Sequence, residues 1–219
     1  MITCSNCGEL SKKDVRLYRD DLKKQNIKIS PILPICVHCN GEVEISHKCT
    51  SGSIIVLNGT CGSGKTAVAE YLRENGYLTI DGDCAIQSLR YKKGVKQYEW
   101  NELIDEIAKE ISLLTYFKKN IVLSHIVLPE DVEKYMHIFE LYGLQYKFIL
   151  LKPDYQIAVE RCQSRITHDS VTPEKWIRHF YDLLVFDKHT ADLIDNTNKT
   201  IEETVTEISN LPWKVAALS

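Results

Sequence analysis

The sequence predicts an α/β protein in which helices cover both faces of a parallel sheet, with a small cysteine-bearing module ahead of the sheet. From residue 54 onward, short apolar runs alternate with segments of helical spacing. A glycine-rich turn at 59–66 joins the first such run to the first helical segment. Two pairs of closely spaced cysteines lie before residue 50. The alternation of strands and helices indicates parallel pairing, because parallel neighbours need a crossover connection.

Length and composition limit the class of protein. The chain has 219 residues and 44% hydrophobic residues, enough for one α/β domain with a core and a small module. The formal charge of −3 argues against an obligate nucleic-acid or membrane protein. No apolar run approaches the ~18 residues of a membrane span, and the polar, cysteine-bearing start is unlike a signal peptide. We therefore expect a cytoplasmic protein without a membrane partner.

The clustered cysteines of the first 50 residues indicate a metal site. The chain has eight cysteines, which we expect to be thiols in the cytoplasm. Two C-x-x-C turns, each followed by a nearby glycine, suit one tetrahedral ion, and four thiolates close the shell of a structural Zn²⁺. Four ordinary buried thiols are the alternative. The predicted zinc ligands are Cys4, Cys7, Cys36 and Cys39.

The link between the two cysteine pairs contains a candidate helix. Helical spacing and Ser11 as the N-cap predict a helix over about Lys12–Gln25. Two prolines then predict an extended segment over 29–35, because proline disfavours helix in the residue before it.

Other side chains of the module leave two questions open. His38, His47 and Cys49 offer further ligand atoms, and the sequence does not decide whether His47 or Cys49 joins the zinc site. The first 50 residues hold eight Lys or Arg and six Asp or Glu, so the module is only slightly basic. A nucleic-acid partner is therefore neither excluded nor supported.

Residues 54–72 carry the most specific motif of the chain. Ile54–Leu57 are predicted to form a short buried strand, and a helix is predicted after the turn, ending at Gly76. The turn matches G-x-x-x-x-G-K-[ST], the pattern of a phosphate-binding loop, or P-loop, and the strand and helix supply its expected context. A glycine turn with a chance lysine is the alternative.

The chemistry of this loop predicts nucleotide binding. Its backbone N–H groups and the helix N-terminus can hold phosphate oxygens. Lys65 is expected to reach the β- and γ-phosphates, and the Thr66 hydroxyl to ligate Mg²⁺. The residues predicted to bind the nucleotide here are Gly59, Thr60, Cys61, Gly62, Ser63, Gly64, Lys65 and Thr66.

The rest of the chain continues the alternation. Residues 85–120 are predicted to be mainly helical, and Thr172-Pro173 begins a later helix. The last strand precedes a helix in which Thr200 and Glu203 form a capping box. The further predicted strands are 77–83, 121–128, 146–153 and 191–196.

Polar residues gather where these strands end. In parallel sheets, ligands bind beyond the carboxyl ends of the strands. Beside the P-loop, this rule selects Asp81, Asp83, Ser124, His125 and residues 195–198.

The order of these motifs resembles the P-loop small-molecule kinases, a group that includes gluconate, shikimate and adenylylsulfate kinases and chloramphenicol phosphotransferase. The resemblance covers about 53–210 and joins the P-loop, the DGD sequence, an arginine pair and IDNTN. It implies a P-loop NTPase fold: three layers, a five-stranded parallel sheet in the order 2-3-1-4-5, and a mobile lid. The cysteine-bearing module lies outside it. We therefore expect a zinc-ribbon-like module at 1–50 and a kinase domain at 51–219.

The third strand departs from a common P-loop pattern. Many P-loop NTPases end this strand in an acidic residue that supports magnesium, whereas this chain has Ser124 and His125. Gluconate-kinase-like proteins similarly have a serine there, which favours kinases over motor or switch NTPases. Asp81 or Asp83 is left to support the metal, and we assign Asp81, with Thr66, to Mg²⁺.

The resemblance also implies roles for residues outside the loop. Asp83 corresponds to a carboxylate that faces the acceptor hydroxyl and acts as the base, although a helix N-cap is the alternative. Arg161 and Arg165 correspond to lid arginines that contact ATP phosphates, with a solvated surface pair as the alternative. Asn196 and Asn198 fit the loop that flanks adenine.

Together these features predict an ATP-dependent kinase for a small hydroxylated molecule, using ATP, Mg²⁺ and a structural Zn²⁺. One alternative is a nucleotide or RNA-end kinase whose zinc module grips the polymer. A second is a non-catalytic, nucleotide-controlled binding protein that uses the zinc module for partner contact. The basic stretch that begins at Arg90 suits an anionic acceptor or a solvated loop equally well. His125 is expected either to face the site or to be an ordinary core histidine.

Overall fold

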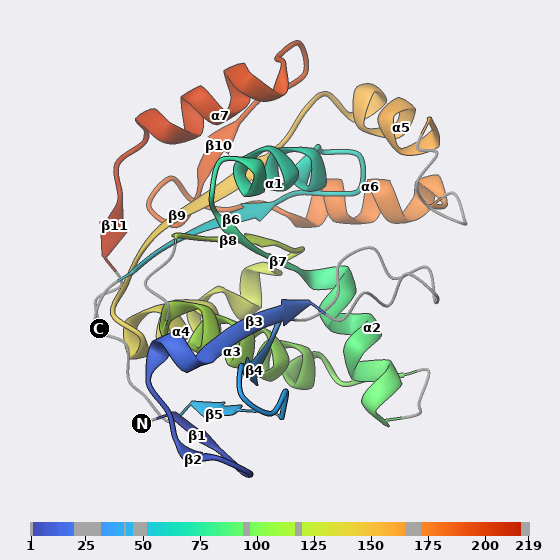
Figure 1. Ribbon diagram of the computed structural model, residues 1–219. Coiled ribbons are helices and arrows are strands. Elements are labelled where there is room, and N and C mark those ends of the chain that lie inside the picture. The colour runs from blue at the N-terminus through green and yellow to red at the C-terminus, as the bar shows by residue number, and fades with distance from the viewer. Residues whose placement is uncertain are drawn as a thin grey trace.

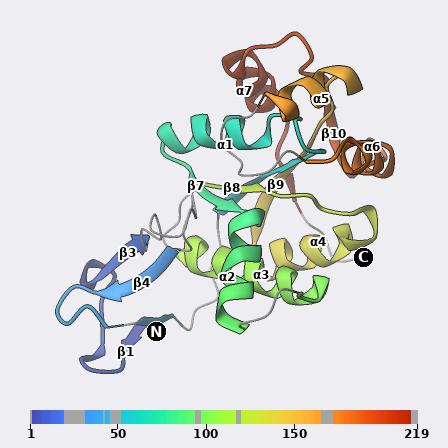
Figure 2. The same ribbon diagram turned by 90° about the vertical axis from the view of Figure 1, so that its right-hand side faces the viewer.

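The computed structural model places a central parallel sheet between two layers of helices, with the cysteine-bearing strands on the side of α2 and α3 (Figures 1 and 2). The described residues are 2–19, 32–41, 43–45, 52–93, 97–116, 120–164 and 172–215. Within them, no helix combines the length and the apolar character needed to cross a membrane.

The central sheet has the predicted topology. Its parallel strands are β6 (Gly52–Asn58), β7 (Leu78–Asp81), β8 (Asn120–Ser124), β9 (Leu144–Leu151) and β10 (Asp192–Ile194). They lie in the order β7-β8-β6-β9-β10, which in chain order is 2-3-1-4-5. Both Leu57 and Asp81 pair with Ser124, so the carboxyl ends of three neighbouring strands are level. A short strand that was not predicted, β11 (Lys214–Val215), pairs antiparallel with the start of β9.

Alternation along the strands divides the core into two layers. Successive strand residues point to opposite faces, so Ile54 and Val56 pack on one side of β6, and Ile55 and Leu57 on the other. The second side is covered by α1 (Lys65–Glu74) and α7 (Ile201–Asn210). The first side is covered by α3 (Trp100–Tyr116) and α4 (Val132–Leu141), with α2 (Gly82–Lys93) packed on α3. Figure 1 shows the layers above and below the sheet.

The remaining elements lie at the carboxyl end of β9 and beyond it. Helices α5 (Tyr155–Gln163) and α6 (Glu174–Leu183) pack on each other through a small cluster that includes Ala158 and Ile177. A short 3-10 helix, η3 (Pro129–Asp131), leads into α4. Helix α7 begins with the predicted capping box of Thr200 and Glu203.

Several predicted elements differ in length. The strand predicted over 77–83 ends at Asp81, because Gly82 and Asp83 begin α2. The strand predicted over 121–128 ends at Ser124, where the chain turns away from the sheet. The long helical stretch divides into α2 and α3, separated by residues 94–99.

The helix predicted over Lys12–Gln25 is wrong in the described part of that range. Residues Lys12–Asp14 form a 3-10 turn, η1, and β3 (Val15–Arg19) pairs antiparallel with β4 (Ile32–Cys36). Ser11 does not cap a helix; its N–H and hydroxyl both donate to the Asp14 carboxylate. Pairing with a distant extended segment therefore overrides the local helical pattern, as tertiary context commonly does. Residues 20–31 lie outside the described residues.

A second small sheet completes the described part of the module. Its strands are β2 (Gly8–Glu9), β1 (Ile2–Cys4) and β5 (Val43–Ile45), in that order and antiparallel. Ile2, Cys4, Cys36 and Val43 form its own small core. No described strand is shared between these sheets and the central one.

Candidate functional site

The P-loop runs from the end of β6 to the start of α1, and its glycines are required by its shape. Gly59, Gly62 and Gly64 have φ values of 141°, 80° and 95°, a region that side chains other than glycine rarely adopt. A Cβ on Gly62 would lie 1.9 Å from the carbonyl oxygen of Ala158, and one on Gly59 would lie 2.4 Å from that of Leu151. The glycines thus permit both the turn and its close approach to the neighbouring backbone.

Asn58 anchors the loop to the segment that follows β8, a role that the sequence analysis missed. Its Oδ1 accepts hydrogen bonds from the N–H groups of Gly59 (2.8 Å) and Val127 (3.2 Å), and its Nδ2 donates to the Val127 carbonyl (2.8 Å). Its signal in the sequence is a polar residue at the end of a buried strand. The Thr60 hydroxyl donates to the Ile177 carbonyl (2.9 Å) and so fixes the loop against α6.

The other side chains of the loop differ in their surroundings, and Lys65 and Thr66 lie in the first turn of α1. Lys65 Nζ donates to the carbonyls of Gly59 (2.6 Å) and Thr60 (3.0 Å), while Thr66 is exposed. The hydroxyl of Ser63 is buried without a hydrogen-bond partner among the described residues. Cys61 packs on the cluster between α5 and α6.

The loop after β10 reaches the P-loop through Asn196. Its Nδ2 donates to the Ser63 carbonyl (3.0 Å), and its buried Oδ1 has no partner in the described part of the chain. Arg161 Nη2 donates to the carbonyls of Asn196 and Thr197, both at 3.0 Å. In this structure Arg161 therefore supports the loop predicted to flank adenine. Asn198 is exposed, and Arg165 lies outside the described residues.

The two aspartates at the tip of β7 have different surroundings. Asp81 Oδ1 accepts from the N–H groups of Asp83 (2.9 Å) and Cys84 (3.3 Å), so Asp81 caps α2, whereas Asp83 is exposed in its first turn. Burial, followed by the charge of Asp83, raises the pKa of Asp81 to about 6, although the two N–H groups and Lys65 oppose this shift. The capping alternative considered for Asp83 thus applies to Asp81.

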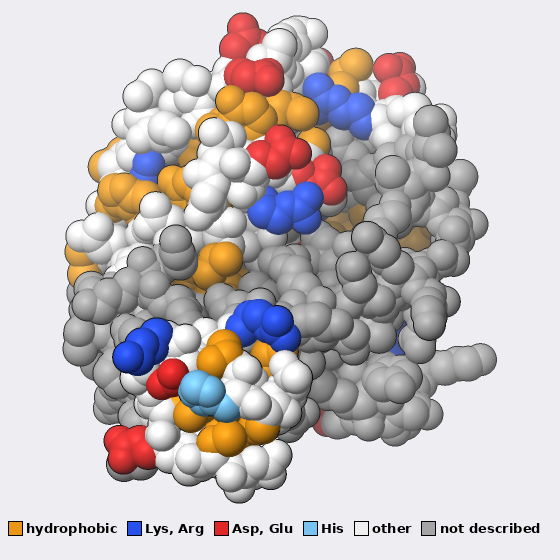
Figure 3. All heavy atoms as spheres, in the orientation of Figure 1, with side chains coloured by type: hydrophobic (Ala, Val, Ile, Leu, Met, Phe, Trp, Pro, Cys, Tyr) orange, Lys and Arg blue, Asp and Glu red, His pale blue; other side chains and the backbone are white. Residues whose placement is uncertain are grey.

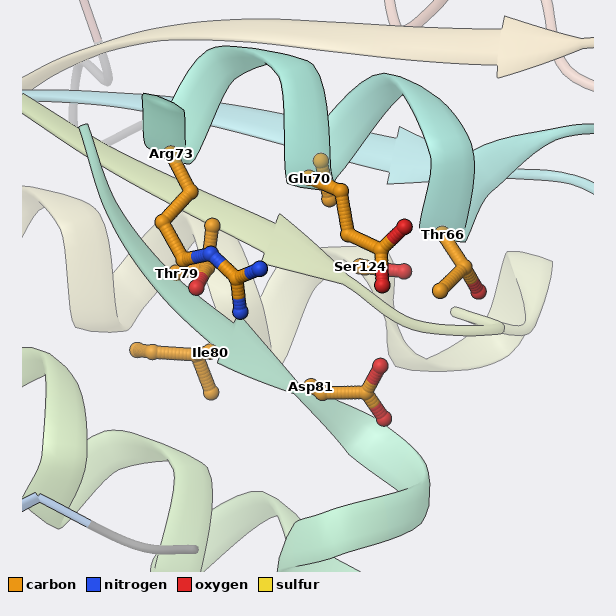
Figure 4. Close-up of a pocket in the computed structure, with 8 residues that line it drawn as sticks. Thr66, Glu70, Arg73, Thr79, Ile80, Asp81 and Ser124 are labelled. Atoms are coloured by element: carbon orange, nitrogen blue, oxygen red, sulfur yellow. The ribbon is translucent and has the colours of Figure 1, made fainter. Parts of the chain in front are cut away.

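A small pocket lies between α1 and the tips of β7 and β8 (Figure 4). Its lining includes Thr66, Glu70, Asp81 and Ser124, and Figure 4 shows the carboxylates of Glu70 and Asp81 turned toward the Thr66 side of the pocket. Oxygen donors of this kind suit Mg²⁺. Glu70 was not selected from the sequence, because one exposed glutamate on a helix carries no signal until the fold places it beside a strand tip.

His125 follows β8 and is a buried histidine. Its backbone N–H donates to the Leu57 carbonyl (3.2 Å), and its ring stacks on Trp100 with centroids 5.7 Å apart. Burial, with a smaller effect of the Lys65 charge, lowers the pKa of His125 to about 3, so the imidazole is neutral. A Cβ on Gly82 would lie 2.0 Å from His125 Nδ1, which shows how closely the ring packs on the start of α2.

The four predicted zinc ligands come together in the N-terminal module. The Sγ atoms of Cys4, Cys7, Cys36 and Cys39 all lie within 4.8 Å of one another. The Cys4–Cys39 and Cys7–Cys36 sulfur distances are 3.4 and 3.8 Å, near the ~3.8 Å that tetrahedral Zn–S bonds of about 2.3 Å imply.

The backbone of both cysteine turns fits the same ion. Gly8 (φ 76°) and Asn40 (φ 58°) each follow the second cysteine of a turn in the left-handed conformation. The Gly41 N–H donates to Cys39 Sγ (3.4 Å), and N–H groups, first that of Asn6, lower the pKa of Cys4 to about 7. The donor set and its spacing therefore fit a structural Zn²⁺.

The comparison with known families follows this geometry. A family model described as an AAA domain matches residues 55–176, more than half of the chain and the part that begins at the P-loop strand. The chain belongs to this family. No curated protein matches the sequence.

Solved structures show the fold of this AAA-domain chain in other proteins. The tunicamycin resistance protein of Deinococcus radiodurans is 17% identical, with a TM-score of 0.57 over 74% of this chain and 98% of that chain. A gluconokinase from Sinorhizobium meliloti 1021 is 22% identical, with a TM-score of 0.51 over 72% and 89%. The Mycobacterium tuberculosis APS kinase, in complex with AMPPNP and APS, is 14% identical, with a TM-score of 0.52 over 74% and 97%. The fold is that of P-loop kinases, as the resemblance implied.

Proposed function

We propose that the protein is an ATP-dependent phosphotransferase that moves the γ-phosphate of ATP to a hydroxyl group of a small molecule. The observation that carries this proposal is the exposed carboxylate of Asp83 at the tip of β7, with the P-loop at the tip of β6 in the same sheet. In phosphoryl transfer a positioned residue orients the nucleophile, and in a kinase that nucleophile is the acceptor hydroxyl.

Each residue of the site has a separate role in the proposed phosphoryl transfer. The N–H groups of the P-loop and Lys65 bind and align the phosphates. Thr66 and Asp81, with Glu70 beside them, would hold Mg²⁺, which supplies charge neutralisation on the phosphate oxygens when bound. Asp83 orients the acceptor hydroxyl and takes its proton.

Residues after β9 are assigned to contacts with the nucleotide base and with the phosphates. We propose that Asn196 and Asn198 flank the adenine and that Arg161 keeps their loop in place through its two carbonyl contacts. Arg161 and Arg165 are also the candidates for phosphate contact during transfer, because guanidinium groups match phosphate oxygens geometrically.

The N-terminal module has a separate role in this proposal. We assign residues 1–50 to a zinc-ribbon-like module and 51–219 to the kinase domain, supported by their separate cores. The Zn²⁺ is structural, because four thiolates leave no open position. Reduced thiols and ATP both suit the cytoplasm. On the face drawn in Figure 3, basic, acidic and apolar side chains of the described residues lie interspersed.

A phosphate-transfer screen tests the proposal. Purified protein, labelled ATP and Mg²⁺ are incubated with sugars, nucleosides, antibiotics and RNA ends, and labelled products are separated. For the acceptor found, Asp83→Asn should lower the transfer rate by about 10²-fold, the lower end of the range for general bases, while ATP affinity stays within a few-fold. Asp105→Asn, an exposed change on α3, is the matched control. Equal rates in wild type and Asp83→Asn would remove Asp83 from the mechanism, and Asp81 would replace it as the candidate.

A further inference from the structure

Three adjoining aromatic side chains near Asp81 and Asp83 hold buried polar atoms that lack partners in the described part of the chain. Trp100 Nε1, His125 Nε2 and the Tyr135 hydroxyl have no hydrogen-bond partner among the described residues. His125 and Tyr135 are 5% and 0% exposed. The His125 ring lies 5.7 Å from Trp100 and 6.3 Å from Tyr135, centroid to centroid. We call these three residues the aromatic cluster.

The aromatic cluster adjoins the proposed reaction centre. It joins α3, the residue after β8, and α4, and so belongs to the helical layer that contains α2. The His125 ring packs on Gly82, the residue between Asp81 and Asp83. The cluster therefore lies directly behind the segment that carries the proposed base.

Unpartnered polar atoms of this kind need an explanation. A buried donor or acceptor that lacks a partner costs folding free energy, and native proteins contain few of them. Of the three other such atoms, Ser63 Oγ and Asn196 Oδ1 lie where the nucleotide is proposed to bind, and Asp192 Oδ2 forms an ion pair with Lys214. The three atoms of the aromatic cluster lie instead behind the start of α2, where the His125 ring packs on Gly82 beside Asp83.

We propose that the aromatic cluster forms the floor of the acceptor subsite, and that the acceptor is an uncharged, polyhydroxylated ring compound such as a sugar or a nucleoside. This inference rests on the proposed function. The indole N–H only donates, the phenol both donates and accepts, and the imidazole Nε2 does one or the other. A hydroxyl group can complement each of these atoms because it both donates and accepts.

The charge state of the cluster argues against an anionic acceptor. Burial keeps His125 neutral and raises the pKa of Tyr135 far above its ordinary value, so neither ring carries charge near pH 7. An anion placed here would lose its hydration, and Lys65, whose charge acts on His125, is assigned to the ATP phosphates. Arg90, a cation of α2 in the described part of the chain, is exposed and lies over the Tyr98 ring, 5.4 Å from its centroid.

The first test measures stability and needs no acceptor. Tyr135→Phe removes only the unpartnered hydroxyl, so the ligand-free variant should melt about 2–4 °C higher than wild type. Tyr146→Phe, on the same side of the sheet, is the matched control and should not gain stability. A lower melting temperature in Tyr135→Phe would mean that the hydroxyl supports the fold, and it would overturn the inference.

The second test measures acceptor use. D-glucose, myo-inositol and uridine are compared with gluconate, shikimate and an RNA oligonucleotide that has a free 5′-hydroxyl. We expect phosphate transfer to a neutral compound, with an acceptor KM raised about tenfold by Tyr135→Phe, as the loss of one hydrogen bond implies. The KM for ATP should not change.

Other outcomes separate this inference from the proposed function. Transfer only to anionic compounds, or an unchanged acceptor KM in Tyr135→Phe, overturns the inference and leaves the kinase proposal standing. ATP binding without transfer to any neutral compound also counts against it. Absence of ATP binding to the wild type, measured by calorimetry, would overturn both.

Discussion

The raised pKa of Asp81 predicts that removing its charge stabilises the protein. The pKa of Asp81 is about 6, against an ordinary value of 3.8. A group whose pKa is higher in the folded state stabilises most when it is protonated, so its contribution is full below pH 3.8 and is lost as the pH rises through 6. A pKa difference of one corresponds to about 1.4 kcal/mol, so the ionised Asp81 lowers the free energy of unfolding by about 3 kcal/mol above pH 7.

The substitution Asp81→Asn should recover this cost. Asparagine keeps the Oδ1 atom that accepts from the N–H groups of Asp83 and Cys84, and it is a favourable N-cap. At pH 8 the variant should be more stable than wild type by up to about 3 kcal/mol, or about 6–12 °C in melting temperature. At pH 4 the two proteins should differ much less, because Asp81 is then protonated in the folded chain and the pH is close to 3.8, where it titrates in the unfolded chain.

The assay is a series of denaturant titrations between pH 4.5 and 8 on wild type, Asp81→Asn and the exposed control Asp105→Asn. The difference between wild type and Asp81→Asn isolates Asp81, because other titrating groups contribute equally to both. The difference should grow between pH 4.5 and about 6 and change little above pH 7. A constant difference, or an Asp81→Asn variant less stable than wild type at pH 8, would refute this account of the buried carboxylate.

Three further predictions test the loop and the zinc module. Lys65→Ala should leave the domain folded and weaken ATP binding in calorimetry, and equal affinity would count against the P-loop assignment. Gly62→Ala should lower the melting temperature by several degrees, because its φ is 80° and its Cβ would meet the Ala158 carbonyl oxygen at 1.9 Å; a neutral effect would contradict the loop geometry. Protein purified without added metal should contain close to one zinc per chain, lost in a Cys36→Ser, Cys39→Ser double variant. Metal-free wild type with a folded N-terminal module would refute the zinc assignment.

The central sheet could be predicted because its signals are local or carried by a specific motif. Buried runs such as Ile54–Leu57 indicate strands wherever they occur, and the P-loop pattern fixed which strand comes first. The strand order came from the resemblance, since pairing between distant strands leaves little trace in one sequence. Strand β11 has only two residues and no pattern of its own, so its pairing with β9 could not be foreseen.

The predictions that failed concern elements and residues whose roles depend on contacts between positions far apart in the sequence. The segment after Ser11 has helical spacing, but pairing of Val15–Arg19 with Ile32–Cys36 makes it a strand. Glu70 and Tyr135 likewise carry no local signal, and Asn58 stands out only as a polar residue at the end of a buried strand. Asn58 matters through Val127, and Tyr135 through His125, and these partners meet only in the folded chain.

The hydrogen bonds at the start of α2 give the neighbouring carboxylates of Asp81 and Asp83 different surroundings. Either aspartate of the DGD sequence could have capped α2. Because Asp81 is the N-cap of α2, its Oδ1 accepts hydrogen bonds from two backbone N–H groups. The Asp81 side chain is thereby held beside α1, near Glu70 and Thr66. Asp83 is then carried into the exposed first turn, where its carboxylate stays available to an acceptor. Gly82 between them admits the His125 ring, so any larger residue there would move both carboxylates. This arrangement places the proposed metal-supporting group and the proposed base two residues apart without making them compete for one role.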